Sequence, residues 1–88
     1  MIKYLGYGIQ KTPGVMGGAA CIRKTRIPVW LLISYRRQDA TDAHILEGHP
    51  DLCAADLVNA FSYAEAYPDE IETAIQENEE DLKVTIFY

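Results

Sequence analysis

The sequence predicts a mainly α-helical fold of about four helices, with a short β-hairpin at its N-terminus. Two observations predict this class. Before residue 28 short β-prone pieces are broken by glycine, and after it apolar residues recur at helical spacing. The 88 residues are expected to form one domain. It divides into a β element at 1–27, a helical bundle at 28–81 and a β-prone tail at 82–88.

The β element is expected to contain one tight hairpin. Residues 21–22 and 25–27 are candidate strands around a turn at 23–24, although that turn lacks the glycine that two-residue hairpin loops favour. Further turns are marked by Pro-Gly at 13–14 and Gly-Gly at 17–18. Strands this short do not hold a sheet alone. They must therefore pack on the helical part or pair with a second copy of the chain.

The first helix is expected over residues 28–38. Proline is favourable at a first helical position, because its missing N–H needs no partner there. Basic residues in the last turn, Arg36 and Arg37, suit the negative end of the helix dipole. The apolar stripe of this helix comprises Val29, Trp30, Leu32 and Ile33.

A helix-turn-helix unit is predicted over residues 41–66. Thr41 or Asp42 caps a short helix that ends at Gly48, and a second helix follows the turn and runs to about residue 67. The apolar face of the second helix comprises Ala54, Leu57, Val58, Phe61 and Ala64. Its expected exposed positions are Ala55, Asp56, Asn59, Ser62, Tyr63 and Glu65. None of these is Lys or Arg, so this helix is a poor match to a nucleic-acid reader.

The last helix is expected to open at Pro68 and to be strongly acidic. Its apolar face comprises Ile71, Ala74 and Ile75. Its other side carries Asp69, Glu70, Glu72, Glu77, Glu79 and Glu80. The closing residues, 82–88, form either an additional C-terminal strand or a tail that finds cover on a partner. The acidic side is either a solvated face or a docking surface for a basic protein.

The charges are sorted along the chain. Residues 1–38 contain seven bases and no acid, whereas residues 39–88 contain thirteen acids and one base. Such asymmetry indicates two faces with different partners, the basic one suited to phosphate. In the alternative, the two halves neutralise each other within one fold or across a dimer. A homodimer is expected because so small a chain buries a limited core.

Several classes of protein are disfavoured by the sequence. There is no apolar run long enough to span a membrane and no apolar signal-peptide region, so a cytoplasmic location is expected. Cys21 and Cys53 lie far apart and are expected to be buried, reduced thiols. His44 and His49 lack a third metal ligand. No arrangement of nucleophile and base is visible, so we expect neither an enzyme nor a cofactor nor a small-molecule substrate.

Two stretches resemble the domain-of-unknown-function 433 family. The first is PGVMGGAACIRKTRIPVW at residues 13–30, where that family has a Gly-Gly pair and a Thr-Arg-Ile-Pro-Val run before a helix. The second begins at Thr41 with TDAHILEGHPDLCAADL. The resemblance covers about residues 9–75. The chain departs from the pattern at Ala19-Ala20, where a charged residue and proline are frequent, and at Lys24, where glycine is common.

The resemblance implies a homeodomain-like helix-turn-helix bundle that is often dimeric. It also implies the DNA-binding antitoxin of a bacterial type II toxin–antitoxin pair, which neutralises a PIN-like nuclease toxin and regulates its own operator. On this reading the candidate DNA-contacting residues are Arg23, Lys24, Arg26, Arg36, Arg37, Asn59 and Ser62. The candidate toxin-contacting residues are Asp69, Glu70, Glu72, Glu77, Glu79, Glu80, Phe87 and Tyr88.

Two alternatives stay open at this stage. Arg23 or Arg26 could pair internally with an acidic helix and so fix the fold instead of gripping DNA, with Arg26 favoured because it adjoins the apolar Ile27. The whole chain could also be a protein-interaction or dimerisation module that never touches DNA.

Overall fold

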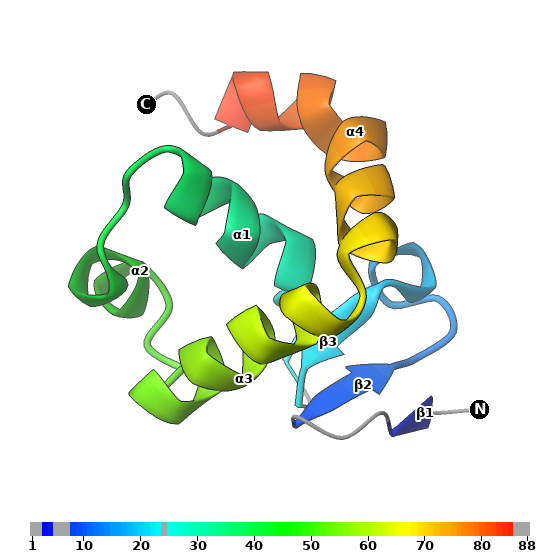
Figure 1. The fold of residues 1–88 in the computed structure, drawn as a ribbon, viewed down its shortest axis with the longest axis horizontal. Coiled ribbons are helices and arrows are strands. Elements are labelled where there is room, and N and C mark those ends of the chain that lie inside the picture. Colours follow the sequence, from blue (N-terminus) through cyan, green and yellow to red (C-terminus); the bar gives the residue numbers. More distant parts are fainter. Residues whose placement is uncertain (1–2, 5–7, 24, 86–88) are drawn as a thin grey trace.

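A computed structural model describes residues 3–4, 8–23 and 25–85 and the side chains of 8–23 and 25–78. Four helices follow a small antiparallel sheet (Figure 1). The strands are β1 (Lys3–Tyr4), β2 (Ile9–Lys11) and β3 (Ala20–Ile22), with a short 3₁₀ turn, η1 (Met16–Gly18), before β3. The helices are α1 (Val29–Arg37), α2 (Asp42–Gly48), α3 (Ala54–Ala66) and α4 (Pro68–Thr85). The predicted mainly helical class with an N-terminal hairpin is therefore confirmed.

The sheet has the order β1-β2-β3, and its hairpin differs from the predicted one. Residues 21–22 do form a strand, but β3 pairs with β2, where Ile9 lies opposite Ile22. Residues 25–27 form a turn instead of a strand. The N–H of Ile22 donates to the carbonyl of Ile27 at 2.9 Å, and only the single bridge between Cys21 and Pro28 continues the pairing. The ladder ends there because proline has no N–H to donate.

Glycine explains the connection between β2 and β3. Gly14, Gly17 and Gly18 have φ values of 81°, 68° and 84°, in the left-handed region that costs glycine little. The predicted turns at 13–14 and 17–18 are thus present. They bring β3 back onto β2, so that Ile9 and Ile22 are both buried beneath the helices.

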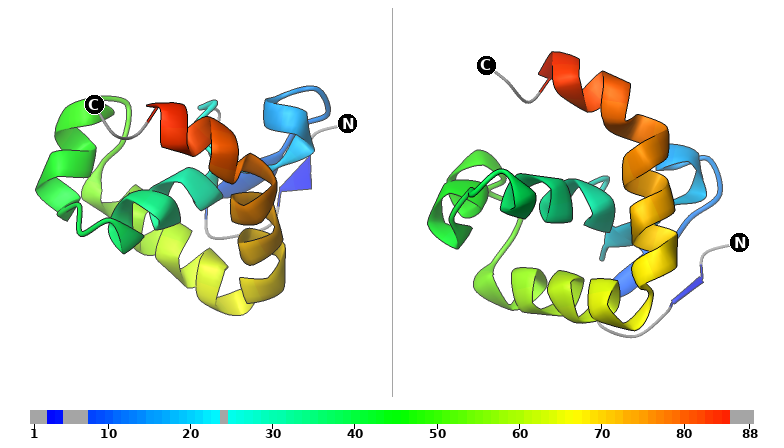
Figure 2. Two further views of the ribbon diagram at one scale, coloured as in Figure 1. Left: turned by 90° about the horizontal axis from the view of Figure 1, so that it is seen from above. Right: turned by 45° about the horizontal axis from the view of Figure 1, so that its top comes forward.

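Helix α1 lies at the centre of the fold and packs on α3, α4 and β3 (Figures 1 and 2). Its predicted apolar residues form the core, since Val29 and Leu32 are fully buried and Trp30 is 8% exposed. Pro28 is the N-cap of this helix instead of its first residue, with extended backbone at ψ 149°. Of the two candidate caps, Thr41 is the N-cap of α2, and its hydroxyl accepts the N–H of His44 at 3.1 Å.

The buried face of α3 is rotated from the predicted one. Leu57, Ala60 and Tyr63 are buried, whereas Val58, assigned to the apolar face, is 63% exposed. Asp56 and Tyr63 were predicted to be exposed and are buried. Both residues can be buried because each has a polar partner. Arg23 binds the carboxylate of Asp56, and Glu70 accepts from the hydroxyl of Tyr63. Hydrophobicity alone therefore misplaced this face.

Helix α4 is longer than expected. It runs to Thr85, so residues 82–85 are helical and the optional C-terminal strand is not formed there. The predicted apolar face is correct, because Ile71 and Ile75 are buried in the core shared with α1. Residues 86–88 lie outside the described residues. Within the described part of the chain, no helix is long and apolar enough to cross a membrane.

One buried hydroxyl and one cap give a matched pair of stability predictions. The Oγ atom of Ser34 is buried on α1 and has no hydrogen-bond partner among the described residues. Ser34→Ala is therefore expected to leave the free energy of unfolding unchanged or to raise it by up to about 1 kcal/mol. Thr41→Ala should lower it by about 1 kcal/mol, because it removes the cap of α2. Urea unfolding of both variants checks the signs. A Ser34→Ala variant that is less stable than the wild type would contradict the absence of a hydrogen-bond partner for the Ser34 hydroxyl among the described residues.

Candidate nucleic-acid and partner interfaces

The basic and acidic halves of the chain meet within the fold. Among the described side chains, four ion pairs join bases of the first 38 residues to acids of the rest: Lys11–Glu70 at 3.3 Å, Arg23–Asp56 at 2.7 Å, Arg36–Asp42 at 3.0 Å and Arg37–Glu72 at 2.6 Å. Internal neutralisation, one of the alternatives drawn from the sequence, is thus confirmed for these pairs. Four of the seven N-terminal bases already have a carboxylate partner.

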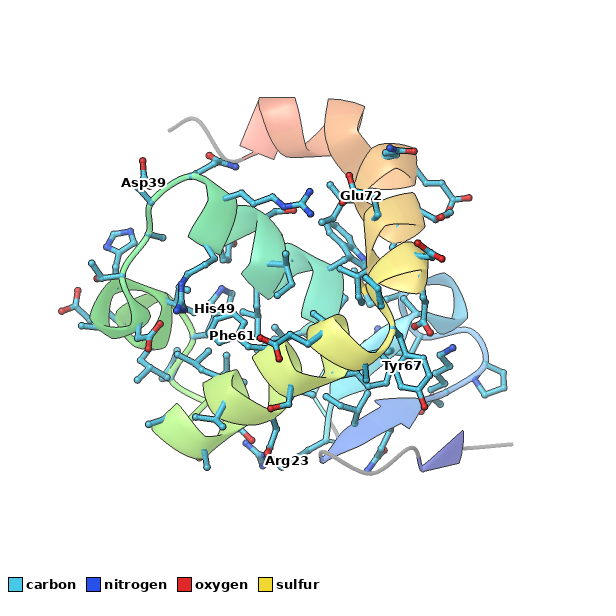
Figure 3. The ribbon with its side chains drawn as sticks, viewed as in Figure 1. Arg23, Asp39, His49, Phe61, Tyr67 and Glu72 are labelled. Carbon is cyan, nitrogen blue, oxygen red and sulfur yellow. The ribbon has the colours of Figure 1, made fainter. Side chains whose placement is uncertain are left out.

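Arg23 is a structural residue. Its Nε and Nη2 atoms donate to the two carboxylate oxygens of Asp56 at 2.8 and 2.7 Å, and Nη2 also donates to the carbonyl of Asp51 at 2.8 Å. The Asp56 side chain is only 5% exposed. Hydrogen bonds from Arg23 lower the pKa of Asp56 to about 2, and the N–H of Cys53 donates to the same carboxylate. Figure 3 shows Arg23 beside α3 and β3.

The internal pairing predicted for Arg26 belongs to Arg23 instead. Arg26 is exposed in the turn before α1 and makes no ion pair with a described carboxylate. Arg23 has a left-handed backbone conformation, with φ 42°, at the position from which its side chain reaches Asp56. Lys24, the other predicted DNA contact in this turn, lies outside the described residues.

The side chains of Arg36 and Arg37, at the end of α1, contact different helices. Arg36 binds Asp42 at the start of α2, and its guanidinium lies 4.3 Å from the centre of the Phe61 ring on α3. Arg37 reaches across to Glu72 on α4. Both arginine side chains are about half exposed, at 51% and 52%. Exposed pairs of this kind contribute about 0–1 kcal/mol, so phosphate can replace the carboxylate at small cost.

The exposed side of α3 differs from the predicted one. Asn59 and Ser62 are half-buried, and the Asn59 amide lies near Gly8, so Asn59 is poorly placed to read a base. The exposed stripe comprises instead Ala54, Ala55, Val58 and Glu65. Small residues at the start of this helix therefore face outward. Asp56 is buried and paired with Arg23, contrary to its expected exposed position.

The acidic residues of α4 divide into two groups. Glu70 accepts from Tyr63 Oη at 2.9 Å and pairs with Lys11, and Glu72 pairs with Arg37, which lowers the pKa of Glu72. Asp69 and Glu77 are exposed and make no ion pair with a described base. The backbone of residues 79 and 80 is helical, but their side chains lie outside the described ones, as do Phe87 and Tyr88 entirely.

The cysteine and histidine residues give no metal site among the described residues. Cys21 is buried, and burial raises the pKa of its thiol. Cys53 is exposed, so the prediction of two buried thiols is wrong for this residue. It is exposed because it is the N-cap of α3 and precedes the buried part of that helix. His49 lies against the Tyr35 ring with centroids 5.7 Å apart.

Comparison with known proteins identifies the family. The model of the family described as "Protein of unknown function (DUF433)" matches residues 9–64, so the chain belongs to this family. A crystal structure of a DUF433 member protein from Anabaena variabilis is similar to it, with 49% sequence identity and a TM-score of 0.77. The similarity covers 81% of this chain and 70% of that chain. No match is found among curated proteins.

Proposed function

We propose that this protein is a DNA-binding antitoxin that holds a PIN-like nuclease toxin in the cytoplasm and represses its own operon as a homodimer. The observation that carries the DNA-binding part is the α2–turn–α3 unit. The start of α3 is exposed and bears small residues, and Arg36 lies against the same pair of helices. In helix-turn-helix proteins the first residues of the second helix contact base edges, and alanine suits a thymine methyl group.

The arginines at the two ends of α1 are the proposed phosphate contacts. Arg26 precedes this helix, and Arg36 and Arg37 end it. Nine helical residues span about 13 Å, close to the roughly 12 Å width of the major groove. In the proposed complex, Arg26 and the pair Arg36 and Arg37 lie at phosphates on the two sides of one groove. Arg23 is left out of the contact set, because releasing it would leave Asp56 buried and unpaired.

Substitution of the phosphate-contacting arginines tests this proposal. Arg26→Gln is expected to weaken binding to the DNA upstream of the gene, and in a dimer to lower the slope of log affinity against log salt by about 2. The measurement is fluorescence anisotropy of a labelled duplex at several salt concentrations. Lys11→Gln is the matched control, since that lysine pairs with Glu70 far from α2 and should leave the slope unchanged.

A second candidate function is a protein-interaction module without DNA binding. The four internal ion pairs favour it, because they reduce the charge available for phosphate. Equal and negligible affinity of the wild-type chain and of Arg26→Gln for the upstream duplex would establish this second function against the first.

A further inference from the structure

A groove of about 650 Å³ lies between η1 and the first half of α4, which we call the α4 groove. Its lining includes Met16 of η1, Trp30 of α1, and Asp69, Ala74 and Glu77 of α4. Figures 1 and 2 show η1 and the start of α4 at one end of the molecule and α2 at the other. The groove is therefore remote from α2 and from the start of α3.

The floor of the α4 groove is apolar. Trp30 and Ile71 belong to the hydrophobic core and line the groove with 8% and 4% of their surface exposed. Met16 stands at the rim and is 46% exposed. A flexible thioether at a rim adapts to the shape of an apolar side chain. The floor and rim together suit an apolar anchor from a partner.

The rim of the groove is acidic. Among the described side chains, three carboxylates line it, those of Asp69, Glu70 and Glu77, against one ammonium, that of Lys11. Lys11 and Glu70 neutralise each other at 3.3 Å. Asp69 and Glu77 remain, and they lie eight residues apart on α4, which is about 12 Å along the helix. Two negative groups at this separation favour an occupant with two cationic side chains at matching distance.

We propose that the α4 groove docks a basic segment of the nuclease toxin, with one apolar side chain on the floor and two cationic side chains at Asp69 and Glu77. The identification of the toxin as the source of this segment rests on the proposed function. Charge complementarity supports the toxin as the source of the segment. A nuclease holds a polyanion and so needs cationic surface of its own. An acidic groove that covers such surface would keep nucleic acid away from the toxin.

Trp30 provides a direct measurement of occupancy, because it is the sole tryptophan of the chain and it lines the groove. The probe is an acetylated, amidated 15-residue peptide without tryptophan. It is rich in alanine and carries one central leucine flanked by two arginines eight positions apart. We expect a saturable change in Trp30 emission and amide shifts confined to the residues that line the groove. The matched peptide with glutamate in place of arginine should cause neither change.

Two variants test the charges of the groove. Asp69→Asn and Glu77→Gln remove carboxylates that make no ion pair with described bases, so both variants should fold as the wild type does. The double variant is expected to bind the arginine peptide at least tenfold more weakly than the wild type does. Glu65→Gln is the control, since Glu65 is an exposed acid on α3 outside the groove. Absent binding, equal binding of the glutamate peptide, or binding that the double variant retains would each overturn the groove assignment.

The same variants, mixed with the purified product of the adjacent gene, separate this proposal from the proposed function. If the wild type and Glu65→Gln form a complex and the double variant forms a weaker one, both the groove proposal and the antitoxin function are supported. A wild-type complex that the double variant retains overturns the toxin as occupant and leaves the antitoxin function standing. No wild-type complex, with the peptide still bound at the groove, overturns the antitoxin function and the toxin as occupant, and supports the groove as a site for basic segments.

Discussion

Asp56→Ala is expected to lower the free energy of unfolding by about 2 kcal/mol, which corresponds to a melting temperature about 10 °C lower for a domain of this size. The substitution removes two charge-assisted hydrogen bonds from Arg23 and the bond that the carboxylate accepts from the Cys53 N–H. Arg23→Ala should be more damaging than Asp56→Ala. It leaves a buried carboxylate without its cation, whereas the half-exposed Arg23 can be hydrated.

The same ion pair predicts acid sensitivity. Asp56 has an ordinary pKa of 3.8 and a pKa of about 2 in the folded protein. A lowered folded pKa contributes stability that is present above pH about 4 and is lost as the pH falls toward 2, here about 2 kcal/mol. Denaturant unfolding of the wild type and of Asp56→Ala between pH 6 and 2 measures this loss of stability. A wild type that loses no more stability than Asp56→Ala over this range would contradict the ion pair.

The affinity of the proposed dimer for the DNA upstream of the gene is expected to fall about 10³-fold between about 50 and 200 mM salt. The estimate counts three arginines in each of two copies, Arg26, Arg36 and Arg37, as six phosphate contacts. Arg36 and Arg37 must exchange a carboxylate for a phosphate, which their exposed ion pairs allow. Anisotropy titrations with the upstream duplex and with a scrambled duplex of equal length measure the slope and the specificity.

A control identifies the source of the salt effect. Asp42→Asn frees Arg36 from its carboxylate and removes a negative charge near the proposed DNA surface, so it should raise the affinity for DNA. A salt slope near zero for the wild type, or a weaker Asp42→Asn complex, would exclude the proposed contacts.

The helices were predictable from the sequence because local signals fix them. Apolar spacing placed α1 and α4, and the hydroxyl of Thr41 marked the start of α2. The sequence does not predict the extension of α4 to Thr85, because residues 82–88 are β-prone, whereas the helix continues without a stop signal before Thr85. Local propensity alone was a weak guide at that end.

The interfaces were less predictable because they depend on contacts between distant residues. Arg23 and Asp56 lie 33 positions apart, so no local spacing joins them. Their pairing buried an acid on α3 and left Val58 outside, which a hydrophobic pattern assigns the other way round. The charge split is visible in the sequence. Which bases pair with a described carboxylate, and which, like Arg26, do not, depends on the fold.

The most direct measurement of the antitoxin function is growth of a bacterial host that expresses the adjacent gene from an inducible promoter, with and without this protein. We predict that induction of the adjacent gene alone arrests growth and that co-expression of the wild-type chain restores it. We further predict that Arg26→Gln, which lies outside the α4 groove, restores growth equally well while losing repression. Arrest that the wild-type chain fails to relieve, or an adjacent product without effect on growth, would contradict the account.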